Sequence, residues 1–209
     1  MCRWGCLYRL DVKEVIFSRA SVRVFRPDPL PVDVVNEVLE AGVRAPIAGG
    51  VEKWFFVVVM SEGKRRKIHE LLKEGHVIYA TKVLKEPYPE RSVRKWVQSM
   101  EAGMYYAPAY IAGYIDMREP RHREEYVDEE RIFLHQTIAT AFQNMILTAW
   151  SLGIGSVWLG VPLFMKEEFN KVLEPPEGLE LAGILALGYP TDKPKPKPRK
   201  TLEQIVKYI

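Results

Sequence analysis

Two short basic segments at opposite ends of the chain carry side chains suited to binding an anion. Residues 18–25 read Ser-Arg-Ala-Ser-Val-Arg-Val-Phe, and residues 197–200 read Lys-Pro-Arg-Lys. Arginine suits this task because its planar guanidinium group donates two hydrogen bonds to one oxyanion. Together the segments predict a phosphate site closed from both ends of the chain. Basic runs more often form solvated surfaces, and this second interpretation stays open at this point.

Outside these segments, no residues have the spacing of a known catalytic or metal site. No two histidines have metal-ligand spacing, and residues 153–160 lack the third glycine of a dinucleotide-binding loop. Cys2 and Cys6 supply only half of a zinc site, and we interpret them as incidental. We therefore expect no metal ion. We expect His69, His76 and His122 at the solvated surface. We expect His135 in the core or at an interface.

The composition is that of an ordinary globular domain. Of the 209 residues, 47% are hydrophobic and 27% are charged, and the length suits one domain over residues 1–209. The 30 basic and 27 acidic residues nearly balance, so a net charge of +3 does not require nucleic acid or an anionic membrane as partner. With only two cysteines and no signal peptide visible in the first ten residues, we expect a cytoplasmic protein.

Helices and strands alternate along the chain and have to bring the two basic segments together. Capped or amphipathic stretches predict helices over residues 11–19, 32–44, 63–73, 92–103, 164–173 and 201–208. Apolar, aromatic and β-branched runs predict strands over residues 54–60, 107–115, 153–160 and 179–187. Tyr105, Tyr106 and Tyr110 are assigned to core packing. The expected class is α/β or α+β, with helices packed on a mixed sheet.

Residues 132–152 form a further helix and begin a stretch without charged residues that extends to Met165. By length alone this segment could span a membrane. Its polar side chains would each need a partner in lipid, which favours instead a helix buried in a globular core or a dimer interface. These side chains are His135, Gln136, Thr137, Gln143, Asn144 and Thr148. We predict the buried helix and no membrane span.

Residues 191–200 alternate lysine with proline and predict an extended, polyproline-like connector. The five cations within residues 193–200 also suit a nucleic-acid binder. No aromatic residue is interleaved with them, unlike in the stacking platforms that bind single strands. We therefore expect no nucleic-acid partner.

Five short motifs stand in the order in which they occur in the nitroreductase family, the flavin-dependent oxidoreductases that bind FMN. They are Arg-x-Ser-x-Arg-x-Phe at 19–25, an Ala-Pro to Trp block at 45–54, Gly-x-Gly-x-x-Trp-Leu-Gly at 153–160, Gly-Tyr-Pro at 188–190 and Lys-x-Arg at 197–199. Each motif is weak alone, but the ordered set covers most of the chain, which resembles that family. The resemblance implies a single α+β domain, close to α/β, with helices around a central mixed, mainly antiparallel sheet.

The resemblance also implies a role for each matching residue. Arg19, Lys197 and Arg199 would hold the FMN phosphate. Ser21 and the backbone at Ala20 would meet the pyrimidine edge of the ring or the adjoining ribityl chain. The cofactor-binding residues implied in this way are Arg19, Ala20, Ser21, Arg23, Pro46, Ile47, Ala48, Gly50, Trp158, Leu159, Gly160, Lys197 and Arg199.

Within this set, Arg23 would lie near the N1 and O2 edge of the flavin and stabilise negative charge there. Hydride transfer occurs on the flavin itself, so the resemblance implies no dedicated protein acid or base. The Pro46–Ala48 turn would meet flavin from the neighbouring subunit. The backbone amides of Leu159 and Gly160 would approach flavin N5, and Trp158 would pack beneath the strand that binds the flavin.

The loop at 45–54 departs from the family pattern. Ile47 stands where the family has Ser, Gly50 where it has Asn, and Glu52–Lys53 where it has Gln-Pro. A hydroxyl and an amide are therefore missing beside the flavin, and the family's side-chain contacts are not carried over to this loop. The backbone N–H groups of Gly49 and Gly50 can still donate hydrogen bonds there.

The resemblance implies a homodimer with FMN sites at the interface, in which NADH or NADPH reduces FMN and a small acceptor then takes the electrons in a ping-pong cycle. Nitroaromatics, quinones or free flavin are the implied acceptors. Residues 76–128 would form a variable excursion or lid, and residues 191–209 a C-terminal extension that embraces the partner. Two alternatives stay open: a flavin-binding redox sensor or carrier without turnover, and a specialised reductive or flavin-consuming enzyme on the same scaffold.

Overall fold

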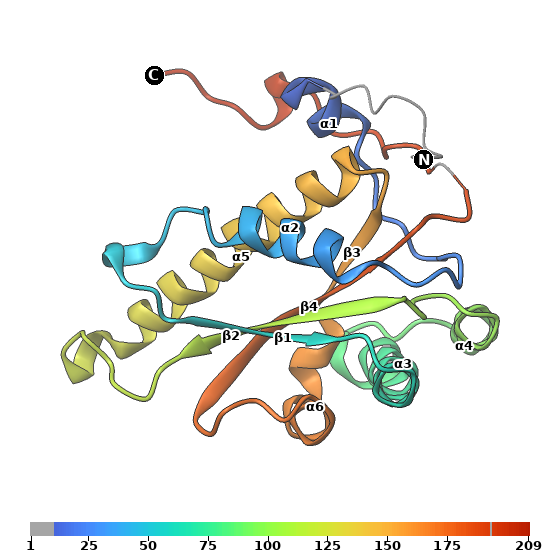
Figure 1. The fold of residues 1–209 in the computed structure, drawn as a ribbon, viewed down its shortest axis with the longest axis horizontal. Coiled ribbons are helices and arrows are strands. Elements are labelled where there is room, and N and C mark those ends of the chain that lie inside the picture. Colours follow the sequence, from blue (N-terminus) through green and yellow to red (C-terminus); the bar gives the residue numbers. More distant parts are fainter. Residues whose placement is uncertain (1–10, 193) are drawn as a thin grey trace.

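The computed structural model describes residues 11–192 and 194–209, and in this part of the chain a single antiparallel sheet lies between two layers of helices (Figure 1). The strands follow the order β1-β2-β4-β3 across the sheet. Their bounds are Trp54–Val59 for β1, Ala109–Asp116 for β2, Gly155–Leu159 for β3 and Leu179–Gly188 for β4. The α+β class with a mainly antiparallel sheet is therefore confirmed. Cys2 and Cys6 lie outside the described residues.

The two central strands are buried on both faces. Ile111 on β2 pairs with Leu185 on β4, and Tyr110 pairs with Ala186. All four of these residues are fully buried. Continuous apolar runs of this kind are expected where helices cover both faces of a sheet.

One helical layer contains α1 (Val12–Ser18), α2 (Val32–Gly42) and α5 (Val127–Ser151), as Figure 1 shows. The long helix α5 packs on the sheet through Ile138, Phe142 and Met145, which are buried against Ile111 and Leu185. The predicted buried helix is confirmed. In the described residues, no helix is both long and apolar enough to cross a lipid bilayer.

The other layer contains α3 (Glu62–Ile78), α4 (Glu90–Glu101) and α6 (Lys166–Leu173). Its core is formed by buried residues of these helices and of the sheet, among them Ile68, Leu72, Met100, Tyr110 and Phe169. The sheet thus separates two hydrophobic cores, and each face of the sheet has its own set of helices.

Residues 21–25 run beside the edge strand β3. Ser21 forms an isolated parallel bridge with Ser156, and Phe25 forms an antiparallel bridge with Pro190. The Val22 amide donates to the Ser156 carbonyl over 3.0 Å. Among the described residues, this bridge is the parallel element of the sheet, whereas the named strands pair antiparallel. The expected mixed character is thus confined to one short contact.

Two predicted helices, those over 63–73 and 132–152, are longer in the structure. Helix α3 continues to Ile78 rather than ending at residue 73, because Gly75 does not end it: a Cβ there would lie 2.5 Å from Val161 Cγ1, so the glycine permits close packing. Helix α5 begins at Val127 rather than residue 132, because acidic residues in a first turn favour the helix macrodipole. The apolar pattern alone misses that turn.

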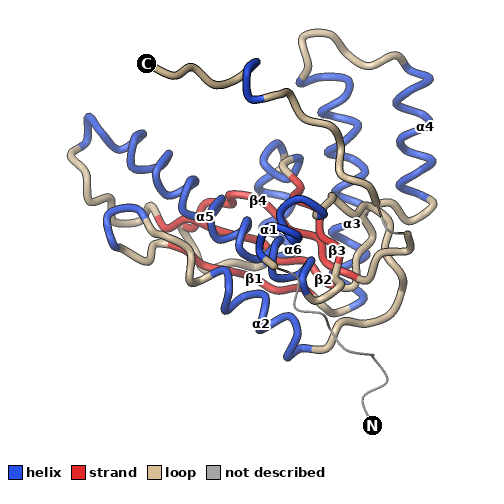
Figure 2. The backbone as a smooth tube through the Cα atoms, turned by 90° about the horizontal axis from the view of Figure 1, so that it is seen from above, coloured by secondary structure: helices blue, strands red, loops and turns tan. Residues whose placement is uncertain are grey.

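The predicted helix over 201–208 is wrong. A single 3₁₀ turn, Leu202–Gln204, is present there, and the segment is exposed throughout. Short helices gain most of their stability from packing an apolar face, and Leu202 and Ile205 are each more than 60% exposed, so the described residues cover little of either side chain. Figure 2 shows this C-terminal segment running along the outside of the molecule.

Candidate functional site

The two basic segments line one cavity of about 160 Å³. The N-terminal segment contributes Arg19, Ala20, Ser21 and Arg23 to the lining, and the C-terminal segment contributes the rest. The C-terminal lining residues are Pro194, Lys195, Pro196, Lys197 and Arg199. The structure therefore brings together residues that lie about as far apart in sequence as this chain permits.

The end of helix α1 positions the N-terminal side of this cavity. Helix α1 begins with the Asp11 amide donating to the Glu14 carboxylate over 3.0 Å, half of a capping box. It ends at Ser18, whose hydroxyl accepts a hydrogen bond from the Trp150 indole over 2.9 Å. Arg19 then adopts extended backbone and directs residues 20–22 along β3. The C-terminal turn of α5 thus fixes where Arg19 leaves the helix.

The end of strand β4 positions the other side. Its last residues pass beside residues 24–26: the Arg26 amide donates to the Tyr189 carbonyl over 2.8 Å, and the Thr191 amide donates to the Val24 carbonyl over 3.4 Å. From there to Thr201 the described residues form no helix or strand. Lys195 also lines the cavity but was not among the predicted site residues. Its position two residues before Lys197 in the same segment could have indicated it.

The cavity carries uncompensated positive charge. Among the described residues, no carboxylate forms an ion pair with Arg19, Arg23, Lys197 or Arg199. Arg23 donates from Nη1 to the Ser21 carbonyl over 3.3 Å, which leaves most of its donors available. A set of fixed cations without anions is suited to a doubly charged phosphate group, so the residues present fit the group that the resemblance implies.

The predicted residues Trp158, Leu159 and Gly160 lie at the far end of β3 from Ser21. Leu159 is buried, whereas Trp158 is 41% exposed. The Trp158 ring stands edge-on to Phe142 with centroids 5.1 Å apart. The indole also lies close to Gly183 on β4, where a Cβ would stand 2.6 Å from Trp158 Nε1, so the ring packs on the sheet and remains partly exposed.

The loop with Pro46, Ile47, Ala48 and Gly50 does not line this cavity. It packs on α5, away from α1 and the C-terminal segment (Figure 1). The Ala48 amide donates to Thr137 Oγ1 over 3.1 Å, and Thr140 Oγ1 donates to the Pro46 carbonyl over 3.2 Å. Gly49 and Gly50 both have positive φ (61° and 68°), a conformation that favours glycine.

Lys53, where the family has proline, forms a partly buried ion pair. Its Nζ lies 2.9 Å from Glu130 Oε1 and donates to the Glu119 carbonyl over 2.5 Å. The other Glu130 oxygen accepts the Arg121 and His122 amides, each over 2.8 Å. Burial opposes the charged form of Glu130, but the hydrogen bonds from the His122 amide, Lys53 and the Arg121 amide outweigh it and lower the pKa to about 2. Sequence reasoning missed this pair, whose members are 77 residues apart.

Two histidine predictions are wrong. His69 and His76 lie on the inner face of α3 and are buried, because the helix turns these positions away from its charged face. His76 Nδ1 donates to the Leu72 carbonyl over 2.7 Å, and the ring stacks on Tyr105. Their spacing of seven residues, in phase with Ile68 and Leu72, was the available signal. His122 is exposed and His135 half-buried, as expected.

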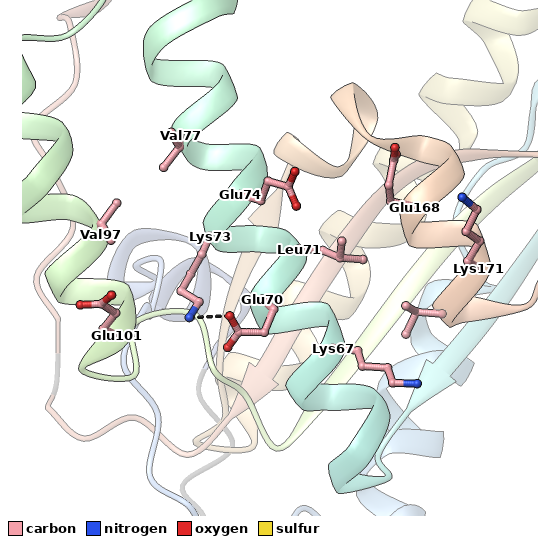
Figure 3. A pocket seen from close by; sticks show the side chains of 11 residues that line it. Lys67, Glu70, Leu71, Lys73, Glu74, Val77, Val97, Glu101, Glu168 and Lys171 are labelled. Atoms are coloured by element: carbon pink, nitrogen blue, oxygen red, sulfur yellow. Dashed lines mark ion pairs between the residues drawn. The ribbon is translucent and has the colours of Figure 1, made fainter.

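A larger groove of about 660 Å³ lies between α3, α4 and α6, on the opposite side of the sheet from α5 (Figure 3). Apolar residues form part of its lining, together with alternating lysines and glutamates such as Lys67, Glu74 and Lys171. Opposite charges compensate one another there, as in the Lys73–Glu70 ion pair of 2.6 Å. None of the predicted site residues lines this groove, so its size alone does not make it the functional site.

In the described residues, no group of three or more metal-ligating side chains gathers at one point. The site is therefore defined by its cations, its extended backbone and the edge of strand β3, rather than by side chains arranged around a metal.

Comparison with known proteins identifies the family. The family model described as "Nitroreductase family" matches residues 16–189. An NADH dehydrogenase of Thermus thermophilus is 27% identical, with 94% of this chain and 95% of that protein covered. Iodotyrosine deiodinase 1 of Rattus norvegicus is 26% identical, with 92% of this chain and 67% of that protein covered.

Among solved structures, a nitroreductase with bound FMN from Bacteroides fragilis is similar, with a TM-score of 0.69 and 26% identity. It covers 96% of this chain, and this chain covers 99% of it. The similarity extends over both helical layers and the sheet. On the match of the family model to residues 16–189, the chain belongs to the nitroreductase family of oxidoreductases.

Proposed function

We propose that the chain is an FMN-dependent oxidoreductase that uses NADH or NADPH to reduce small organic acceptors. The observation that carries this proposal is the cavity in which Arg19, Lys197 and Arg199 gather without a carboxylate partner among the described residues. Similar proteins named for NADH dehydrogenase activity and for bound FMN support it.

In this proposal Arg19, Lys197 and Arg199 bind the FMN phosphate by charge-assisted hydrogen bonds. Ser21 and the Ala20 backbone lie on the same cavity wall and orient the part of the cofactor that follows the phosphate. Because Ser21 is bridged to Ser156, the cofactor would be aligned along β3 towards Gly160.

FMN, when bound, supplies the hydride chemistry, and the chain positions it and stabilises charge. Arg23 provides a fixed cation at the cavity wall that favours an anionic ring edge. No described histidine lines this cavity, which agrees with a reaction that requires no dedicated acid or base from the protein.

The proposed enzyme acts as a homodimer. Large apolar side chains on α1, on the N-terminal half of α5 and on the C-terminal segment are exposed in the single chain, which is typical of an interaction surface. They include Val12, Ile16, Phe17, Ile132, Phe133, Leu202, Ile205 and Tyr208. A second copy would cover them, take up residues 191–209, and bring the Pro46–Gly50 loop to the partner's flavin. The location in the cytoplasm stays a prediction.

A second candidate is a specialised reductive or flavin-consuming enzyme on the same scaffold. Ile47, Gly50 and Lys53 change the loop that would face the partner's flavin, and an iodotyrosine deiodinase is among the similar proteins. The choice of acceptor therefore distinguishes the two candidates, whereas FMN binding and reduction are common to both.

The test begins with purified protein incubated with FMN and freed of unbound cofactor by gel filtration. We expect a yellow dimer that bleaches when NADH or NADPH is added without oxygen. The reduced protein is then mixed with a panel of quinones, nitroaromatics, halogenated phenols and free flavin. Bleaching without reoxidation by any acceptor would favour another reaction on the scaffold, and binding without bleaching would favour a sensor or carrier. Protein that does not bind FMN would refute the proposal.

A further inference from the structure

Tyr105 has a backbone conformation that large side chains rarely adopt. Its φ is 69°, in the left-handed region, where a bulky residue is a true outlier. Such residues persist only when the surrounding structure holds them in place, and they are concentrated at functional sites. Tyr105 lies between α4 and β2, so it ends the segment that returns from the outermost helix to the sheet.

Two side chains, those of Tyr110 and His76, contact Tyr105 and hold it in this conformation. The Tyr110 hydroxyl donates to its carbonyl over 2.6 Å, and the same hydroxyl accepts the Ala107 amide over 3.1 Å. Its ring stacks on the buried His76 ring with centroids 4.9 Å apart and planes 14° apart. The His76 ring is held from the other side by Trp96, edge-on at 4.7 Å. Tyr105 is 7% exposed and Tyr110 is fully buried, so the arrangement is enclosed.

The left-handed conformation directs the Tyr105 amide at the N-terminal basic segment. That amide donates to the Arg23 carbonyl over 2.7 Å, among the shortest backbone bonds between distant parts of the chain. On its other side, Arg23 is preceded by Val22, whose amide is bonded to Ser156. The Arg23 backbone is therefore fixed from the sheet edge and from Tyr105, while its side chain lines the cavity.

We propose that Tyr105 is a positioning residue for Arg23: Tyr110 and His76 lock its left-handed backbone, which holds the Arg23 carbonyl and sets where the guanidinium group stands. This inference rests on the proposed function, since it concerns the cation beside the bound flavin. It also links residues 76–104 to the cofactor site, because His76 and Trp96 belong to that segment.

The chain offers a matched pair of substitutions that test the proposal. Tyr110→Phe removes the hydroxyl that holds the Tyr105 carbonyl. Tyr114→Phe is the control, because Tyr114 is equally buried on the same strand and its hydroxyl donates to Asn170 Oδ1 over 3.0 Å, away from Arg23. Tyr110→Phe loses two hydrogen bonds and Tyr114→Phe loses one, so the potential and the reduction rate of each variant are compared with its own loss of stability.

The measurements are the free energy of unfolding, FMN affinity, the midpoint potential of bound FMN and the rate of its reduction by NADH or NADPH. We expect Tyr110→Phe alone to make the potential more negative and to slow reduction about fivefold, as for the loss of one net hydrogen bond. In an Arg23→Ala background, Tyr110→Phe should have no further effect on either. An equal potential and rate in Tyr110→Phe and Tyr114→Phe would overturn the inference. So would an effect of Tyr110→Phe on the potential and rate that is as large in the Arg23→Ala background as in wild type.

A second pair tests the backbone directly. Tyr105→Asn and Tyr105→Val both remove the ring, but asparagine tolerates positive φ and a β-branched residue does not. We expect the valine variant to shift the potential more than the asparagine variant, and equal shifts would contradict the role of the backbone. If wild-type protein binds no FMN, both the proposed function and this inference fail; if it binds FMN and the pairs behave alike, only this inference fails.

Discussion

The ammonium group of Lys53 lies 2.9 Å from the carboxylate of Glu130, whose side chain is buried, while that of Lys53 is 16% exposed. This pair joins the end of the 46–53 loop to the first turn of α5, and through the amides of Arg121 and His122 it also holds the loop before α5. Arg121 in turn donates from Nη1 to the Gly49 carbonyl over 3.2 Å. A charged residue at a position where the family has proline thus organises the loop that departs from the family pattern.

The first prediction concerns this pair. Glu130→Gln keeps the volume but leaves the partly buried Lys53 without its counter-charge, so the free energy of unfolding should fall by about 2 kcal/mol. Urea denaturation measures it. The exposed Arg66–Glu62 pair is the control, and Arg66→Gln should change stability little because solvent already screens both groups. Equal effects in the two variants would show that the Lys53–Glu130 pair is not buried in solution.

The second prediction is the pH dependence of the same pair. The pKa of Glu130 is lowered from 4.5 to about 2 in the folded state, so its contribution is complete above pH 4.5 and is lost as the pH falls towards 2. The stability difference between wild type and Glu130→Gln should therefore shrink over that interval. Denaturation curves at pH 5, 4 and 3 measure it, and a constant difference would contradict the lowered pKa.

The third prediction concerns His76. Burial disfavours its charged form more than the Leu72 carbonyl favours it, so its pKa lies below 6.5. The unfolded chain takes up a proton near pH 6.5 and the folded state resists it, so this contribution to stability is full above pH 6.5 and declines below it. Stability should fall less between pH 7.5 and 5.5 in His76→Phe than in wild type. Urea denaturation at pH 7.5, 6.5 and 5.5 measures this, and the same slope in both proteins would contradict the buried neutral form of His76.

The fourth prediction tests the cations of the cavity. Arg19→Ala and Arg199→Ala should each weaken FMN binding about 10- to 100-fold, because each removes a charge-assisted hydrogen bond to phosphate. Fluorescence quenching of FMN on titration with protein measures the affinity. Lys200→Ala is the control, since Lys200 neighbours Arg199 in sequence but does not line the cavity. An unchanged affinity in both arginine variants would show that the FMN phosphate does not bind in this cavity.

The fifth prediction concerns Gly155, where residues 21–22 cross β3. A Cβ at this position would stand 2.6 Å from Val22 Cβ, so Gly155→Ala has to displace the segment that carries Ser21 and Arg23. We expect a loss of about 1–3 kcal/mol in stability together with weaker FMN binding. Gly63→Ala is the control, because a Cβ there meets nothing within 4 Å. Unaltered FMN binding in Gly155→Ala would show that the contact between Gly155 and residues 21–22 does not position the FMN site.

Local features of the sequence account for much of the fold. The apolar runs of β1, β2 and β4 and the apolar face of α5 follow from side-chain type and period, and the structure confirms these elements. Their ends were less predictable: Gly75 suggests a helix end until its contact with Val161 is known, and Leu202 suggests a helix although its side chain is mostly exposed.

The residues around the cavity show most clearly which properties follow from the sequence and which from the fold. The sequence by itself determined that Arg19 and Arg199 are cations of a kind that binds phosphate, because charge and donor geometry belong to the side chain. Only the folded chain determined that they line one cavity, that His76 is buried, that Lys53 finds Glu130 and that Tyr105 holds Arg23. Each of these facts is a contact between distant segments, and such contacts depend on how two helical layers and a sheet pack together rather than on any local pattern.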